Sequence, residues 1–134
     1  MELNVRVIKE SDWSMLTDWW AGHGWPTPRK DNLPDNGTGG IIVEENNKPV
    51  IAGFIYQTNS KGCWLEYIIS KPNYKNDRSH LIDTLVASAE KTALSMGFKY
   101  MLFIGKSKGI RESMKKQGWV EDPKPSYEVM KKLN

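Results

Sequence analysis

The sequence lacks several features that mark particular protein classes. It has one cysteine, Cys63, in 134 residues, so no internal disulfide can form and a reducing compartment, the cytoplasm, is expected. We interpret Cys63 as a small buried hydrophobic residue rather than as a nucleophile. The two histidines, His23 and His80, lie far apart in the chain. No metal-ligand cluster is visible, and no metal is expected.

Long apolar runs and a strong net charge are also missing. No stretch approaches the length needed to cross a bilayer, and the first residues, MELNVRVIKE, lack the basic and apolar segments of a secretory signal. The formal net charge of +3 is too small to indicate nucleic-acid binding by itself. We therefore expect a single domain over residues 1–134, with no membrane segment and no strong nucleic-acid signal.

Tryptophan, in contrast, is abundant, and four of the six tryptophans lie within residues 13–25. Trp19, Trp20 and Trp25 flank a loop at 22–40 that is rich in Gly, Pro, Asn and Asp. A loop of this length in a small domain is often functional. Because adjacent tryptophans on a helix cannot point the same way, we expect Trp19 or Trp20 to be exposed or to lie at a cleft or an interface. The alternative is that these residues, Trp13 first, pack the helix on a sheet.

Hydrophobic periodicity predicts a sequence of strands and helices along the chain. Alternating Val- and Ile-rich segments indicate strands, and apolar spacings of three and four indicate helices. The expected strands are 3–8, 41–45, 49–58, 63–70, 98–105 and 126–133, and the expected helices are 12–21, 78–97 and 108–118. Residues 41–70 form an antiparallel meander, and the helix at 78–97 crosses over to a parallel strand. The expected fold is α/β (α+β): a mixed, mostly antiparallel sheet flanked by helices, in the order β-α-β-β-β-α-β-α-β.

One carboxylate, Glu66, interrupts the apolar strand at 63–70. Both faces of this strand are otherwise apolar, so we expect it in the interior of the sheet. Burying a carboxylate is costly unless it is paired, protonated or used in chemistry. The residue pattern alone favours a structural ion pair with Arg or Lys of a neighbouring strand.

The element order and several segments resemble the GCN5-related N-acetyltransferase (GNAT) superfamily. The likeness covers nearly the whole chain and depends most on the strand with Glu66, on Pro72 and Tyr74, and on the segments GFKYMLF and KKQGWV. The segments DWW, LPDNGTGGIIVE, PVIAGFIYQT and LEYIISKP look like small acetyltransferase-like proteins that phages often encode. The resemblance implies transfer of an acetyl group from acetyl-CoA to a primary amine. The acceptor is a small molecule or a protein, and the amine attacks directly in a ternary complex.

The resemblance also implies a site. Two parallel strands splay apart, the acetyl-CoA arm lies along the strand end, and the pyrophosphate lies over the start of the following helix. Glu66 becomes the general base, with a pKa raised beside Trp64, and a strand N–H near Ile68 holds the oxyanion. The implied cofactor-binding residues are Ile68, Ile69, Lys75, Asn76, Asp77, Arg78, Ser79, His80 and Ser107, and the implied acceptor-side residues are Trp19, Trp20 and Trp25.

Two segments depart from the family pattern. Arg78 and His80 stand where the family's phosphate loop has Gly and Gly or Ala. Either side chains such as Lys75 replace the lost backbone contacts, or the loop no longer binds CoA. Met114 stands where many members place a tyrosine general acid, and Ser107 replaces a common Asn.

Two rival functions therefore stay open at this point. One is a catalytically degenerate binding module that grips a protein or a nucleic-acid base through its tryptophan-rich surface. The other is a structural component of a homodimer. The expected oligomeric state is a monomer or a homodimer.

Overall fold

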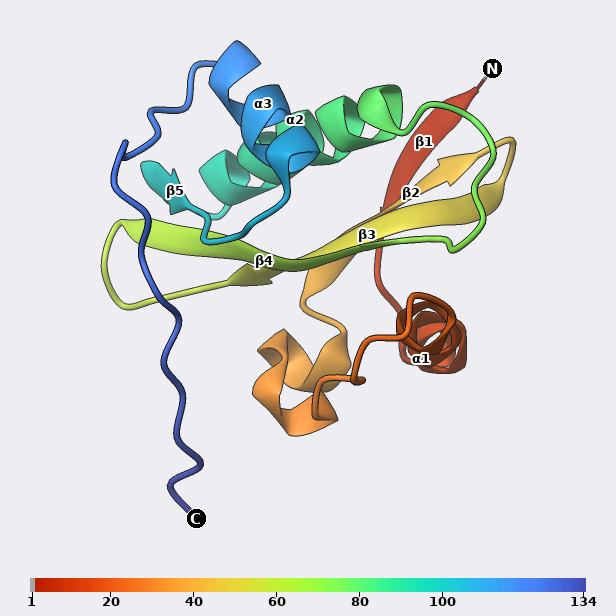
Figure 1. Ribbon diagram of the computed structural model, residues 1–134, viewed down its shortest axis with the longest axis horizontal. Coiled ribbons are helices and arrows are strands. Elements are labelled where there is room, and N and C mark those ends of the chain that lie inside the picture. Colours follow the sequence, from red (N-terminus) through yellow and green to blue (C-terminus); the bar gives the residue numbers. More distant parts are fainter. Residues whose placement is uncertain (1) are drawn as a thin grey trace.

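The computed structural model describes residues 2–134, which form one twisted five-stranded sheet with helices on both faces (Figure 1). The strands are neighbours in chain order. The first four are antiparallel and the fifth is parallel to the fourth: β1 (Leu3–Val7), β2 (Gly40–Glu45), β3 (Lys48–Tyr56), β4 (Gly62–Ser70) and β5 (Tyr100–Leu102). The predicted meander and its parallel continuation are confirmed.

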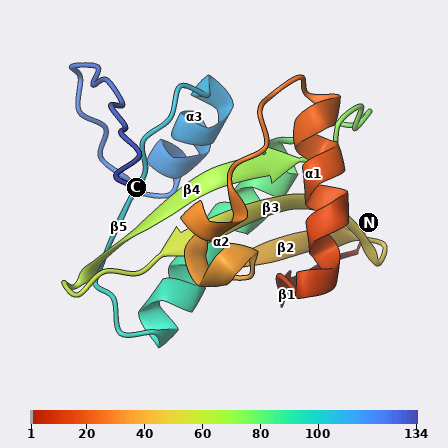
Figure 2. The same ribbon diagram turned by 90° about the horizontal axis from the view of Figure 1, so that it is seen from below.

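Three helices and three short 3-10 turns cover the sheet. They are α1 (Trp13–Gly22), α2 (Ser79–Ser95) and α3 (Lys108–Lys116), with η1 (Glu10–Asp12), η2 (Lys30–Asn32) and η3 (Pro34–Gly37). Seen from below, α1 and the segment with η2 and η3 lie on one face of the sheet, and α2 lies on the other (Figure 2). No helix in residues 2–134 is long and apolar enough to span a bilayer.

Each face of the sheet has its own apolar core. On the α2 face, Leu81, Leu85 and Val86 pack on the strands together with Leu65 and Cys63. The apolar period of three and four along α2 predicts this stripe. Cys63 is fully buried, and burial raises the pKa of its thiol, so its interpretation as a small buried residue is confirmed.

The second core lies between α1 and the sheet, and it corrects the prediction for two tryptophans. Trp19 and Trp20 are only 5% and 4% exposed, so the expectation that one of them lies at the surface is wrong. Trp20 stacks on Phe54 at 6.4 Å between ring centroids. The segment after α1 contributes Leu33 to the same core, so apolar side chains meet α1 over a wide arc rather than a single stripe.

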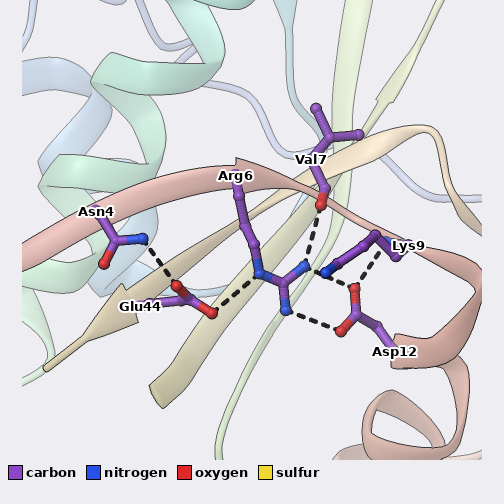
Figure 3. Close-up of polar contacts among 6 residues, drawn as sticks. All are labelled: Asn4, Arg6, Val7, Lys9, Asp12 and Glu44. Carbon is purple, nitrogen blue, oxygen red and sulfur yellow. Dashed lines mark hydrogen bonds and ion pairs between the residues drawn. The ribbon is translucent and has the colours of Figure 1, made fainter. Parts of the chain in front are cut away.

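A partly buried ionic network fixes the start of α1 to the sheet (Figure 3). Arg6 on β1 donates to both carboxylate oxygens of Asp12, at 2.8 and 2.9 Å, and to Glu44 on β2 at 3.0 Å. Asp12 also accepts the amide of Lys9 at 2.7 Å, and Asn4 donates to Glu44 at 2.8 Å. The bidentate Arg6 contact lets a carboxylate that is 7% exposed stay ionised inside the fold.

The end of the chain differs from the prediction. The strand expected at 98–105 shortens to Tyr100–Leu102, and the strand expected at 126–133 is absent, so the final β of the predicted order is wrong. A strand needs a partner for its backbone groups, and the segment after α3 pairs with none. It also contains Pro123 and Pro125, which have no N–H to donate.

Candidate functional site

The parallel pairing of β4 and β5 stops half-way along β4. It joins Gly62 to Tyr100, Cys63 to Met101 and Trp64 to Leu102, whereas β4 continues to Ser70. Beyond Trp64, no backbone hydrogen bond joins β4 to the segment after β5 in the described chain. The strand edge between Leu65 and Ser70 therefore faces a gap in the sheet instead of a partner strand.

A β-bulge lies within this unpaired half of β4. Phe54 pairs with Glu66 and Ala52 with Ile69, so one residue of β3 faces two residues of β4, Tyr67 and Ile68. Tyr67 adopts a φ of 51°, the left-handed region that side chains other than glycine rarely occupy. A bulge bends its strand and increases the local twist, and bulges are common beside active sites. Here the bulge gives a local reason for β4 to turn away from β5.

Glu66 lies at the mouth of this gap. Its Oε2 accepts the backbone N–H of Ile104, two residues past β5, at 2.7 Å. Within residues 2–134 it forms no ion pair, so the alternative of a structural pair with Arg or Lys is not what the structure shows. Burial raises the pKa of Glu66 to about 7, against the lowering by the Ile104 hydrogen bond and with a smaller contribution from the charge of Glu128.

Two tyrosines near Glu66 were missed by the sequence analysis. Tyr56 and Tyr67 lie 6.4 Å apart between ring centroids and pack on the core of the α1 face. Tyr56 donates to the carbonyl of Asn32 at 2.8 Å, and burial, together with Tyr67 and Glu66, raises its pKa to about 12. Simple alternation predicts that Tyr67 points away from its neighbour Glu66. Only the bulge brings both toward the same face, and no sequence signal announced it.

The loop before α2 places its own carboxylate at the helix start. Asp77 accepts the backbone N–H of Ser79 at 3.0 Å and the Ser79 hydroxyl at 2.9 Å. Ser79 is the first helical residue, and its hydroxyl donates to Asp77. Arg78, the N-cap residue, donates to the carbonyl of Lys71 at 3.3 Å. Lys75 and Asn76 are exposed.

His80 turns away from the loop and toward the end of β2. Its Nε2 lies 3.2 Å from Glu45 Oε2, and the hydroxyl of Tyr74 donates to the same oxygen at 2.7 Å. These two contacts lower the pKa of Glu45, with Tyr74 the larger cause. Glu45 therefore ties both ends of the loop 74–80 to β2. The contact joins residues 35 positions apart, so no local pattern predicts it.

The other expected site residues are placed as follows. Ser107 caps α3, and its hydroxyl accepts the N–H of Ile110 at 3.3 Å. Trp25 is 53% exposed and stacks on His23 at 4.5 Å, and His23 in turn contacts the Ser70 carbonyl at the end of β4 at 2.8 Å. Of the three tryptophans expected on the acceptor side, Trp25 alone presents a face to solvent. Ile68 and Ile69 lie on the unpaired half of β4, as the resemblance implies.

Comparison with solved structures agrees with this architecture. Ribosomal-protein-alanine N-acetyltransferase from Brucella melitensis superposes with a TM-score of 0.67 at 10% identity, covering 98% of this chain and 100% of that one. A GNAT family acetyltransferase from Staphylococcus aureus gives 0.61 at 13% identity, covering 97% and 100%. This chain has the fold of the GNAT acetyltransferases.

A third solved structure carries a ligand. N-acetylglutamate synthase from Neisseria gonorrhoeae, complexed with coenzyme A and N-acetyl-glutamate, superposes with a TM-score of 0.67 at 12% identity. The match covers 88% of this chain and 28% of that one. No protein-family model and no curated protein sequence matches the chain. The GNAT resemblance is confirmed for the fold, whereas the likeness to phage-encoded proteins stays a prediction.

Proposed function

We propose that this protein is a GNAT-type N-acetyltransferase that moves an acetyl group from acetyl-CoA to a primary amine of a small molecule or a protein. The observation that carries the proposal is Glu66 itself. It is a carboxylate at a gap in the sheet, with no cationic partner in the described chain, and its pKa is raised by burial to about 7. A general base with a pKa near the working pH combines a populated deprotonated form with useful basicity.

The gap beside β4 suits an extended acyl-CoA arm. The arm would lie along the backbone at Ile68 and Ile69, as an added strand lies along an open edge. Acetyl-CoA supplies the activated thioester. Glu66 takes the proton from the acceptor ammonium, the free amine nitrogen forms a bond to the thioester carbonyl carbon, and the carbon–sulfur bond breaks. An N–H near Ile68 would hold the oxyanion, and the departing thiolate takes up a proton.

The start of α2, where the CoA pyrophosphate would lie, is partly occupied by a side chain of the protein itself. A helix start attracts phosphate through its free N–H groups, and Asp77 occupies that of Ser79. The amide of His80 donates no hydrogen bond within residues 2–134 and stays available to an anion, whereas Leu81 is fully buried. Lys75 is exposed on the same loop and would supply the positive charge, together with Asn76 and Arg78. Phosphate binding at Ser79 requires Asp77 to move aside.

The direct test is turnover with acetyl-CoA against a panel of primary amines, measured by release of the CoA thiol. Glu66→Gln keeps an oxygen to accept the Ile104 amide but cannot take a proton. We expect the variant to bind CoA like the natural protein and to lose turnover by about 10²-fold or more. Glu112→Gln, the same change at an exposed carboxylate of α3, is the matched control. Turnover by Glu66→Gln at the natural rate would contradict the assignment.

A binding module without catalysis is the second candidate, and one observation favours it. The Asp77 carboxylate at the start of α2 repels a phosphate group, as expected of a loop that no longer binds CoA. The burial of Trp19 and Trp20 counts against it, because the tryptophan-rich surface reduces to Trp25. Binding of a partner with CoA absent, together with loss of that binding in Trp25→Ala, would support the binding module. Saturable CoA binding argues for the enzyme.

A further inference from the structure

A groove of about 550 Å³ lies beyond the end of β5, between α3 and the segment after it. In both views that segment lies beside α3, at the β5 edge of the sheet (Figures 1 and 2). Ile104 lines the groove, and its amide is the one that donates to Glu66 at 2.7 Å. Tyr127 also lines it, and the charge of its neighbour Glu128 acts on Glu66. The groove and the Glu66 gap are therefore parts of one site, and one end of that site is acidic.

The lining of the groove itself is mostly cationic. Four cationic side chains line it against two carboxylates: Arg111, Lys115, Lys106 and Lys124, with Glu121 and Asp122. Lys106 and Lys124 form no ion pair within residues 2–134. A concave surface with an excess of one charge concentrates ligands of the opposite charge. The groove therefore attracts an anionic group.

Arg111 and Lys115 already hold a carboxylate that belongs to the chain itself. Arg111 donates to Glu121 Oε2 at 2.6 Å, and Lys115 donates to Glu121 Oε1 at 3.3 Å. These two cations, Arg111 first, lower the pKa of Glu121. The Arg111 and Glu121 side chains are both about one-third exposed, so a carboxylate from solution can reach the pair and compete for it. The contact shows what kind of anion these two donors accept.

Apolar side chains line the rest of the groove. Phe103, Met114 and Trp119 are among them, and they belong to the segment after β5, to α3 and to the residues that follow α3. Methylene groups of a ligand can pack on such walls. The volume is in the range of sites for small molecules.

We propose that the acceptor is a small zwitterion: a primary amine that also carries a carboxylate, with its amine at Glu66 and its carboxylate on Arg111 and Lys115. This inference rests on the proposed acetyl transfer and adds the class of acceptor to it. Glu121 holds the carboxylate position in the free protein, and the acceptor displaces it. An amine without an anionic group leaves Arg111 with Glu121 and gains nothing at that end.

The first test is turnover on matched acceptors: glycine, β-alanine and γ-aminobutyrate, each beside its neutral carboxamide. Rates are compared per free amine, because the carboxylate also changes the basicity of the amine. We expect kcat/KM for the best acid to exceed that for its amide by about 10- to 100-fold, the range for one charge-assisted hydrogen bond. The length of the best acid reports the separation of the two ends of the site.

Two variants should change acceptor binding in opposite directions. Arg111→Gln removes a donor and should raise KM for the acids by about 10-fold or more, with kcat nearly unchanged. Glu121→Gln releases Arg111 and Lys115 and should lower that KM by a few-fold. Neither variant should change KM for the amides or affinity for CoA. Lys108→Gln, on α3 but paired with Glu112 and outside the groove lining, is the matched control.

A binding measurement separates this inference from acetyl transfer itself. Each acid and its amide are titrated into the chain with and without CoA, and the NMR signals of the Ile104 amide and the Arg111 guanidinium are followed. Saturable binding of an acid but not of its amide, lost in Arg111→Gln, supports the zwitterion site even in a chain that transfers no acetyl group. Circular dichroism checks that each variant is folded, and Lys115→Gln repeats the test at the second cation.

The contrary outcomes are distinct. Equal turnover on acids and amides would leave acetyl transfer standing and overturn the zwitterion. A loss of CoA affinity in Arg111→Gln would assign the positive charge to the cofactor instead. Phosphoethanolamine as a better acceptor than every acid would overturn the carboxylate. Absence of both turnover and acid binding would overturn this inference and the proposed function together.

Discussion

Asp12 and Glu66 are both carboxylates withdrawn from water, and their surroundings are opposite. Asp12 accepts two hydrogen bonds from Arg6 and one from the Lys9 amide, and the Arg6 contact is the main reason that its pKa is lowered. Glu66 has one backbone N–H as its partner, and burial raises its pKa to about 7. A carboxylate that serves stability is fully paired, whereas a carboxylate that serves as a base keeps a proton within reach of neutral pH.

The largest expected effect separates the two residues by activity. Glu66→Gln should lower turnover by about 10²–10⁴-fold, the range for loss of a general base, while cofactor affinity stays unchanged. Asp12→Asn should keep turnover at temperatures where it is folded. Steady-state kinetics on both variants decides this. Equal losses in the two variants would show that Glu66 acts only through the fold.

For stability, we expect the larger loss in the Asp12 variant and the smaller loss in the Glu66 variant. Asp12→Ala leaves the partly buried Arg6 with Glu44 but without its bidentate partner, and loss of charge-assisted hydrogen bonds of this kind costs about 2 kcal/mol. Glu66→Gln removes no cationic pair and keeps the acceptor for Ile104, so its unfolding free energy at neutral pH should stay the same or rise. Urea unfolding measures both. A Glu66→Gln variant less stable than Asp12→Ala would contradict the comparison.

The pH dependence should differ in sign. The lowered pKa of Asp12 adds stability that is present above its ordinary titration range and is lost as the pH falls through the folded-state pKa. The raised pKa of Glu66 acts the other way. The stability that it adds is fully present below about pH 4.5, the ordinary pKa of this carboxyl group, and is lost as the pH rises to about 7.

A plot of the unfolding free energy against pH should therefore show less loss of stability at acid pH in Asp12→Asn than in the natural protein. In Glu66→Gln the same plot should no longer fall between about pH 4.5 and about pH 7. In the natural protein, kcat/KM should rise with pH, with a midpoint near 7, because the base must be deprotonated. A flat kcat/KM profile from acid to neutral pH would remove the base role.

The smallest expected effect concerns the loop. Asp77→Asn removes the negative charge at the start of α2 while keeping an oxygen that can accept the Ser79 amide. CoA affinity should rise by a few-fold, because the phosphate no longer meets a carboxylate. Asp122→Asn, a carboxylate that also accepts a nearby backbone N–H but lies in the segment after α3, is the matched control. If both variants bind CoA like the natural protein, Asp77 is not at the phosphate position.

Local patterns accounted for most of the fold. The meander and α2 follow from alternation and from the period of three and four, and both appear with boundaries close to the predicted ones. The final strand could not be judged from SYEVMKKL alone, because a strand forms only where an edge accepts it. The expectation that Trp19 or Trp20 is exposed failed for a similar reason, since strand residues distant in the chain, such as Phe54, bury them together with Leu33 from the segment after α1.

The site was predictable only in part. Glu66 was identified because a carboxylate in an apolar strand is conspicuous, and the resemblance placed the gap beside Ile68. The bulge that turns Tyr67 toward the face of Glu66 has no sequence mark, and the Asp77 acceptor for the Ser79 amide is predictable only if the helix start is located to one residue. The tie between His80 and Glu45 depends on tertiary structure alone.

Everything in the proposed mechanism depends on an acyl-CoA arm entering the gap between β4 and the segment after β5. Isothermal titration of the full chain with CoA measures this directly. We predict saturable binding at one CoA per chain, with the amide signals of Ile68, Ile69 and Ile104 shifting in a parallel NMR titration. Absence of heat at millimolar CoA, or binding that leaves those three amides unmoved, would contradict it.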